Sequence, residues 1–467
     1  MIRNRAELEE FHGREAGIVL GALDAAIKSV EPGRLVRRAM KFDGTNGHLV
    51  VRDIAGDSVR RFEGFKDVYI VGAGKATAAM ADAACSILKG RVAGGAINVP
   101  RDGAGDRIND RRIQVTHASH PIPDRSGLKG AKRIVDVVRS AGDDDLVLVL
   151  ISGGGSALMP LPAKGLTIAD KQEMTSRLLA SGVSIQEVNV VRKHLSAVKG
   201  GRLVQGARCT IVSLVLSDVI GDDLGSIASG PTSPDPSTFA DAARIIKKYR
   251  IAGPAAAIRH LSKGAGGLIE ETPKPGDPAF GRVHNFIIGN NELACRAAVA
   301  YLKRRGVNAR YLGSDFAGDA ARFGRQMAGI ACPAVAGGET TVRLGRQKKR
   351  GKGGRNQEAA LAFALAGRRK KGSEAIAGFI GTDGIDGNSD AAGAIISKRS
   401  MLLSEKIDAK KFLAEHDSYH ALKKIKSLIF TGRTGTNVND VAAVVLLRRA
   451  DTATTTTTAA AGDHDIA

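Results

Sequence analysis

The sequence of 467 residues has no tryptophan, and aromatic residues of all kinds make up only 4% of it. Cysteine is also scarce. The four cysteines lie far apart, without a Cys-x-x-Cys pair, at Cys85, Cys209, Cys295 and Cys332. This spacing argues against a disulfide framework and against a zinc knuckle, since both need closely spaced cysteines. We therefore interpret the four residues as ordinary buried thiols.

Long hydrophobic runs are missing as well. No apolar stretch reaches the roughly 18 residues that a membrane-spanning helix needs. The first residues include Glu7, Glu9 and Glu10 and lack the apolar stretch of a signal peptide. Hydrophobic residues still make up 43% of the chain, which is enough for sizeable buried cores. We expect a cytoplasmic, folded protein of roughly two to four domains that does not contact a membrane.

Acidic residues are outnumbered by basic ones, and the formal net charge is +21. A charge of this size raises the possibility of a nucleic-acid partner. The basic residues, however, are spread along the whole chain, and neither a zinc-finger motif nor a stacking motif accompanies them. These observations favour a solvated surface that attracts anionic substrates, and nucleic-acid binding is the remote alternative.

Apolar runs alternate with helical patterns along most of the chain. In the first part, strands are expected at residues 68–71, 95–99, 113–116, 146–151 and 211–216. The alternation predicts a mostly parallel, doubly wound sheet. A glycine- and proline-rich connection leads to a second α/β region, with strands expected at 283–288, 309–312, 331–336, 375–381 and 428–430. We predict an N-terminal domain at 1–270, a C-terminal domain at 280–450 and a disordered, low-complexity tail at 451–467.

Two glycine-rich turns follow buried strands. The strand at 146–151 runs into Ser152-Gly-Gly-Gly-Ser156, whose backbone amides could bind an anion, although the glycines could also mark close packing. The strand at 68–71 runs into Gly72-Ala-Gly-Lys75, but Thr77 stands where a dinucleotide-binding loop has its third glycine. Lys75 opposes the positive end of the dipole of the next helix, and a bound anion would explain this placement.

Charged side chains follow several of the expected strands. On a helix, Arg192, Ser196 and Lys199 would share one face, which either lines a cleft or is solvated. Asp218, Asp222 and Asp383 come after expected strands, where one or two carboxylates with nucleotide phosphates could hold magnesium. Helix capping or solvation is the alternative for Asp222.

Two further segments belong to the second region. Arg355 precedes an apolar helical pattern, and its guanidinium could bind phosphate or carboxylate in two contacts. The segment at 434–440 is predicted to cap an apolar helix that runs to residue 447, and the amides at its start would suit an anion.

Nine motifs occur in consistent order over about residues 14–447. They are Gly72-Ala-Gly-Lys75, Ser119-His-Pro-Ile-Pro-Asp124, Ser152-Gly-Gly-Gly-Ser-Ala157, Val191-Arg-Lys-His194 with Lys199-Gly-Gly201, Leu216-Ser-Asp218 with Gly221-Asp-Asp223 and Ser229-Gly-Pro231, Glu271-Thr-Pro-Lys-Pro-Gly276, Gly354-Arg-Asn-Gln-Glu358, Gly381-Thr-Asp-Gly384 and Thr434-Gly-Thr-Asn437. Together they resemble the glycerate 2-kinase family with its characteristic C-terminal domain.

The resemblance implies a two-domain α/β enzyme with a Rossmann-like first domain, a second α/β domain and an active site in the cleft between them. Such an enzyme would transfer the γ-phosphoryl group of ATP to the 2-hydroxyl of D-glycerate, giving 2-phosphoglycerate and ADP, with Mg²⁺ as the metal. The alternative is a hydroxypyruvate or tartronate reductase with a nicotinamide cofactor, which the missing third glycine disfavours. The oligomeric state stays open.

The resemblance also assigns roles to individual residues. It makes Lys75 and Arg355 the catalytic cations. Metal ligands are expected among Asp218, Asp222 and Asp383. The residues expected to bind substrate or phosphate are Gly72, Gly74, Ser152, Gly153, Gly154, Gly155, Ser156, Arg192, Lys199, Asn356 and Asn437.

Overall fold

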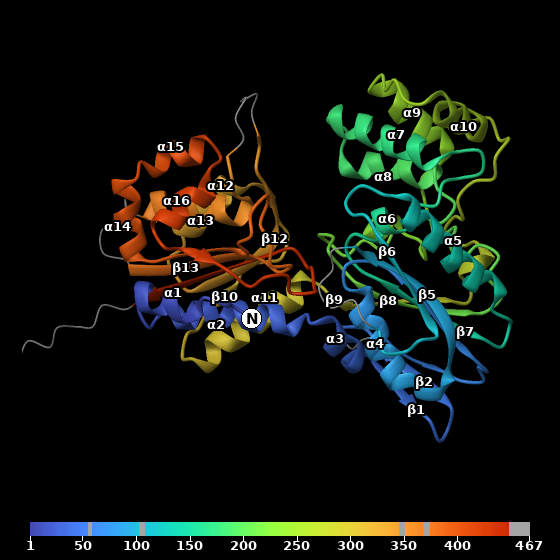
Figure 1. The fold of residues 1–467 in the computed structure, drawn as a ribbon, viewed down its shortest axis with the longest axis horizontal. Coiled ribbons are helices and arrows are strands. Elements are labelled where there is room, and N and C mark those ends of the chain that lie inside the picture. Colours follow the sequence, from blue (N-terminus) through green and yellow to red (C-terminus); the bar gives the residue numbers. More distant parts are fainter. Residues whose placement is uncertain (55–57, 102–107, 345–350, 368–373, 448–467) are drawn as a thin grey trace, which may run out of the picture.

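The computed structural model describes residues 1–54, 58–101, 108–344, 351–367 and 374–447. These residues form two α/β lobes that lie side by side (Figure 1). The predicted disordered tail at 451–467 lies outside the described residues. Among the helices of the described part, none combines the length and the apolar character needed to cross a membrane.

The first lobe is built on a parallel sheet. Its strands are β4 (Val68–Ala73), β5 (Val92–Pro100), β6 (Ile113–Ala118), β7 (Leu146–Ile151), β8 (Thr210–Leu216) and β9 (Val283–Gly289). They lie in the order β6-β5-β4-β7-β8-β9, and every neighbouring pair is parallel. This is the strand order of a Rossmann fold, so the predicted doubly wound sheet is confirmed. The placement of the strand at 283–288 in the second region is wrong, because β9 pairs with β8.

Helices cover both faces of this sheet, which explains why all six residues of the central strand β7 are buried. Leu148 and its alternate neighbours pack on the side of α3 (Pro32–Ala39) and α4 (Thr77–Leu88). Val147 and Val149 point the other way, toward α5 (Arg125–Ser140). A small antiparallel sheet of β1 (Met40–Asp43), β2 (His48–Arg52) and β3 (Val59–Phe62) lies at the far end of the lobe (Figure 1).

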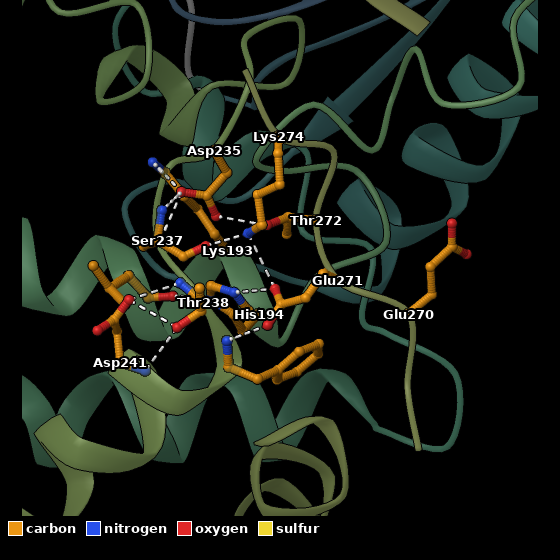
Figure 2. Close-up of polar contacts among 12 residues, drawn as sticks. Lys193, His194, Asp235, Ser237, Thr238, Asp241, Glu270, Glu271, Thr272 and Lys274 are labelled. Carbon is orange, nitrogen blue, oxygen red and sulfur yellow. Dashed lines mark hydrogen bonds and ion pairs between the residues drawn. The ribbon is translucent and has the colours of Figure 1, made fainter. Parts of the chain in front are cut away.

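A cluster of helices extends the first lobe beyond its sheet (Figure 1). The cluster holds α7 (Ile168–Ala180), α8 (Ile185–His194), α9 (Phe239–Lys248) and α10 (Ala255–Ala265). Polar contacts tie its connecting loops together (Figure 2). The buried carboxylate of Asp235 accepts hydrogen bonds from Lys193 at 3.3 Å, Ser237 at 2.7 Å and Thr272 at 3.1 Å. These contacts fix the C-terminal end of α8 relative to the loops that follow β8.

The second lobe is built on a mixed sheet. Its strands are β10 (Arg310–Tyr311), β11 (Phe316–Asp319), β12 (Ala334–Thr341), β13 (Glu374–Gly381), β14 (Gly393–Ile396), β15 (Leu428–Ile429) and β16 (Asp440–Leu447). The central strand β16 pairs antiparallel with both β12 and β13. The predicted helix running to residue 447 is therefore wrong. Its valine-rich apolar run is short and bounded by polar residues, which suits a buried strand.

Two helical layers cover the second sheet. One holds α2 (Ala16–Ser29) and α11 (Asn291–Arg304), and the other holds α12 (Ala320–Ala328) and α13 (Arg355–Gly367). The short helices α1 (Arg5–His12), α14 (Lys398–Lys406), α15 (Ala409–Ala414) and α16 (Ser418–Lys424) lie at the outer end of the same lobe (Figure 1).

The two lobes exchange chain segments. Helix α2 precedes the first sheet in sequence but packs against α11 and the strands β13 and β16 of the second lobe. Strand β9 follows the glycine- and proline-rich segment but completes the first sheet. The chain therefore passes between the lobes twice, once between α2 and α3 and once between β9 and α11. The division at residues 1–270 and 280–450 stays a prediction. Helix α2 lies before this boundary in sequence but packs in the second lobe, and β9 lies after it but pairs in the first sheet.

Candidate active site

A cleft of about 1380 Å³ lies between the lobes. The first lobe contributes Lys75, Gly154, Ser156, Arg192 and Asp218 to its walls, and the second contributes Glu339, Arg355, Asp383 and Asn437. The cleft thus brings together most of the charged residues singled out in the sequence. It lies beyond the carboxyl ends of β4, β7 and β8, where open parallel sheets bind ligands.

Lys75 stands two residues after the end of β4, and its side chain reaches across the cleft. Its backbone amide donates to the carbonyl of Gly153 at 2.9 Å, which fixes the turn. Its side-chain Nζ lies 3.4 Å from Oδ2 of Asp383, which follows β13 in the other lobe. The two loops expected from sequence to carry chemistry therefore meet through one ion pair.

The glycines of the two turns allow them to pack against each other. A Cβ atom on Gly74 would lie 2.0 Å from Oγ of Ser152, and one on Gly72 would lie 2.2 Å from the carbonyl oxygen of Leu150. Ser152 is buried, and its Oγ accepts a hydrogen bond from the amide of Ala76 at 3.0 Å. These contacts favour the packing interpretation for Gly72, Gly74 and Ser152. In the second turn, Gly154 and Ser156 line the cleft.

Asp218 lies against the glycine-rich turn after β7. A Cβ on Gly153 would approach Oδ2 of Asp218 to 2.3 Å, so only glycine leaves room for this carboxylate. Burial and, after it, the negative charge of Glu339 raise the pKa of Asp218 to about 6, against the opposing effect of Lys75. The carboxylate is thus held in an acidic part of the cleft that a cation would stabilise.

Arg355 begins α13 and binds two carboxylates from different strands. Its Nη1 donates to Oε1 of Glu339 at 2.8 Å, and its Nε lies 2.6 Å from Oδ2 of Asp440. Burial alone would lower the pKa of Arg355, but Asp440 and Glu339 outweigh it and raise the pKa above its ordinary value. The guanidinium is therefore a permanent cation with a fixed orientation.

A buried carboxylate holds the start of α13 in place. Asp386 accepts hydrogen bonds from the backbone amides of Asn356 at 3.1 Å and Gln357 at 2.8 Å. The side chain of Asn356 donates to Asp386 at 3.2 Å and to Asp440 at 2.9 Å. Asn356 is buried and orients Asp440, whereas Asn437 reaches the cleft wall.

Sequence reasoning gave no role to Glu339, Asp386 and Asp440. Glu339 stands near the end of β12, after two glycines, and this position at a strand end was the available signal. Asp440 was included in the predicted helix cap, so its true place at the start of a central strand was missed. Asp386 is one of several acids that follow β13 in the sequence, and nothing in that pattern singles it out.

The predicted common face of Arg192, Ser196 and Lys199 is wrong. Helix α8 ends at His194, and Ser196 instead donates a hydrogen bond to the carbonyl of Leu161 at 3.1 Å. Arg192 still lines the cleft. Lys199 lies buried behind the cleft wall. Its Nζ donates to two atoms of Ser156, the carbonyl oxygen at 2.8 Å and Oγ at 2.9 Å.

The three candidate metal ligands do not lie together. Asp218 and Asp383 line the cleft, but Asp222 accepts a hydrogen bond from Asn290 at 2.6 Å and is not part of its walls. Within the described ranges, no group of three or more His, Cys, Asp or Glu side chains could hold a metal ion by itself. Magnesium needs only one or two carboxylates beside phosphate oxygens, so Asp218 and Asp383 fit such an ion.

The chain is similar to known proteins over most of its length. Residues 18–262 match the family described as a domain of unknown function, DUF4147, and residues 332–440 match the MOFRL family. Glycerate 2-kinase from Pyrococcus horikoshii is 40% identical over 92% of this chain and 97% of its own length. This chain belongs to the glycerate 2-kinase family.

Further relatives of this glycerate 2-kinase family member carry two kinds of name. The solved structure of glycerate kinase from Thermotoga maritima matches with a TM-score of 0.78 and 34% identity, over 92% of this chain and 99% of that chain. A protein from Agrobacterium vitis that is 44% identical over 80% of this chain and 86% of its own length carries the provisional name hydroxypyruvate reductase.

Proposed function

We propose that this protein transfers the γ-phosphoryl group of ATP to the 2-hydroxyl of D-glycerate, giving 2-phosphoglycerate and ADP. The observation that carries the proposal is the convergence of Lys75 and Arg355 from different lobes on one cleft. Phosphoryl transfer depends on charge neutralisation and in-line positioning more than on covalent chemistry, and two opposed cations supply both.

Different residues of the cleft would bind different parts of the two substrates. Lys75 and Arg355 neutralise the charge that builds up on the migrating phosphoryl group. The exposed part of the turn after β7, at Gly154 and Ser156, with Arg192 and Asn437, binds the remaining anionic groups. The new bond joins the 2-oxygen of glycerate to the γ-phosphorus, the bond from that phosphorus to the bridging oxygen of ADP breaks, and the proton of the 2-hydroxyl is released to water.

Mg²⁺ belongs to the proposal through the cleft acids. Asp218 and Asp383 would hold it, and the ion would neutralise phosphate oxygens of the nucleotide when bound. Asp383 also holds Lys75 at 3.4 Å, so it positions the lysine for the phosphoryl group. D-Glycerate, ATP and a cytoplasmic site of action are parts of the same proposal.

The reductase alternative conflicts with the first glycine turn. Thr77 begins α4 and is fully buried at the place where a dinucleotide-binding loop has glycine. The helix therefore cannot approach the chain as closely as in the nicotinamide-binding fingerprint. The A. vitis relative's name is the remaining support for that activity.

One pair of assays separates the two enzymes. ADP release with D-glycerate and ATP is measured beside NADH oxidation with hydroxypyruvate, and phosphorus NMR locates the phosphate on the product. We expect ADP release, loss of this activity in Arg355→Met and no NADH oxidation. NADH oxidation without ADP release would refute the proposal.

A further inference from the structure

Lys199 is a buried lysine without a charged partner of opposite sign in its contacts. It is 2% exposed, and its Nζ contacts the carbonyl oxygen and Oγ of Ser156. Two basic side chains act on it in the described part of the chain: Arg192 on α8, and Lys171 on α7, whose own pKa burial lowers to about 7. An ammonium group in this position is repelled by its neighbours and has no bulk water to solvate it.

The carboxylate beside the Lys199 segment is already engaged. Asp235 lies against Gly200, where an added Cβ would be 3.1 Å from its Oδ2. Figure 2 shows that Asp235 instead faces Lys193, Ser237 and Thr272, which all donate to it. Asp235 therefore compensates Lys193. Burial, aided by Lys171 and Arg192, lowers the pKa of Lys199 well below its ordinary value and thus favours the neutral amine.

A chain of hydroxyl groups connects this amine to the cleft. Oγ of Ser156 lies 3.0 Å from Oγ of Ser229, and Ser229 in turn donates to Oδ1 of Asn189 at 3.4 Å. Ser156, Ser229, Asn189 and Arg192 all line the cleft. An anion toward which the two serine hydroxyls turned, away from their present acceptors, would lie one hydroxyl group away from Lys199 and near Arg192.

We propose that the carboxylate of D-glycerate binds at Ser156 and Ser229 and that Lys199 takes up a proton from solvent when it binds. This inference rests on the proposed function and names the substrate end of the same cleft. The bound negative charge offsets the repulsion from Lys171 and Arg192 and favours the ammonium form of Lys199. The uptake converts the neutral amine into an ammonium ion and needs no other reactant. Linkage then requires that the affinity for D-glycerate falls as pH rises.

Calorimetry of the whole protein tests the uptake. D-Glycerate is titrated at pH 8 in buffers that differ in ionisation enthalpy, and the slope of heat against that enthalpy counts protons. We expect up to about one proton taken up per D-glycerate bound. D-Glyceramide, which replaces the carboxylate by a neutral amide, should show no uptake and weaker binding.

Variants assign the proton to one residue. Lys199→Met should remove the uptake and weaken D-glycerate binding about tenfold or more. Lys263→Met is the control, because this exposed lysine on α10 lies outside the cleft walls, and it should keep the uptake of the unmodified protein. Full uptake in a folded Lys199→Met protein would overturn the inference.

If Lys199→Met does not fold, calorimetry and ADP release of the unmodified protein can still overturn the inference. D-Glycerate that binds and is phosphorylated with no buffer-dependent heat would overturn the role of Lys199 and leave the proposed function intact. Absence of both D-glycerate binding and ADP release would instead overturn the proposed function and this inference with it.

Discussion

Nζ of Lys75 lies 3.4 Å from Oδ2 of Asp383, across the cleft between two separately built sheets. Both side chains remain partly exposed, so the ion pair adds little to stability. The ion pair instead fixes the position of the Lys75 side chain. The lysine after β4 points toward the lobe that carries Arg355, and the acid after β13 holds it there.

Removing the charge of Lys75 should abolish most of the activity. We expect Lys75→Met to lower kcat for D-glycerate by about a hundredfold or more, as loss of one charge-stabilising donor commonly does. ADP release measures the rate, and thermal unfolding checks that the fold is kept. Lys132→Met, on the exposed face of α5, is the matched control and should keep normal turnover. Near-normal turnover in folded Lys75→Met would exclude the central role of this lysine.

The cap of α13 should affect activity as well as stability. Asp386→Ala removes the acceptor for the amides of Asn356 and Gln357, and we expect the free energy of unfolding in urea to fall by about 1–2 kcal/mol. Turnover should fall too, because Arg355 begins the same helix.

The control for this change is a second cap in the same lobe. Asp319 accepts from the amide of Arg322 at 2.7 Å at the start of α12, outside the cleft walls. Asp319→Ala should cost a similar amount of stability and leave turnover unchanged. Equal turnover losses in the two variants would contradict a positioning role for Asp386.

Gly153 should tolerate no side chain. In Gly153→Ala the new methyl group would meet Oδ2 of Asp218 at 2.3 Å and Nδ2 of Asn437 at 3.2 Å. Displacing these groups should lower kcat/KM about a hundredfold, since misplacement by 1 Å in an active site commonly has this effect. Gly90→Ala, where nothing lies within 4 Å, should behave like the unmodified protein. Unchanged kinetics in Gly153→Ala would show that the contact with Asp218 is not needed.

The docking of α1 should make stability depend on pH. His12 Nδ1 lies 2.8 Å from Oγ of Ser397 and Nε2 lies 3.1 Å from the carbonyl oxygen of Lys426, and burial lowers the pKa of His12 to about 4. The fold therefore favours the neutral ring. This stabilisation is complete above the unfolded pKa of 6.5 and is lost as pH falls from there toward 4.

The loss attributable to His12 should reach about 3 kcal/mol of unfolding free energy at pH 4. Urea unfolding at a series of pH values measures it. His12→Gln should remove this component, whereas His117→Gln, at an exposed position, should keep it. An unchanged pH slope in His12→Gln would assign the effect to other groups.

The first sheet was predictable because its signals are local. Strands β4, β7 and β8 are apolar runs that enter polar or glycine-rich turns, and the helices between the strands set the parallel order. The motif resemblance pointed to Lys75 and Arg355, and both line the cleft. The periodicity of apolar residues and the spacing of the motifs identified these strands and the two cations without knowledge of distant contacts.

The errors came from features that only tertiary contacts decide. The run after Asp440 has no clear period, and its pairing with β12 and β13 makes it a strand. The acids that hold Arg355 lie on strands separated from it in sequence, so no local pattern joins Glu339, Arg355 and Asp440. Asp222 follows the same strand as Asp218, but its bond to Asn290 takes it out of the cleft.

The exchange of segments between the lobes has a consequence for how they can move and be separated. Thr436 donates to the carbonyl of Val30 at 2.6 Å, and Gly289 packs against Leu35, so the two crossings are braced by neighbouring contacts. Because two chain segments join the lobes, twisting of one lobe against the other is more restricted than it would be with a single linker. A C-terminal fragment that begins at residue 280 and is expressed alone would lack α2 and leave an apolar face of the second sheet open to aggregation.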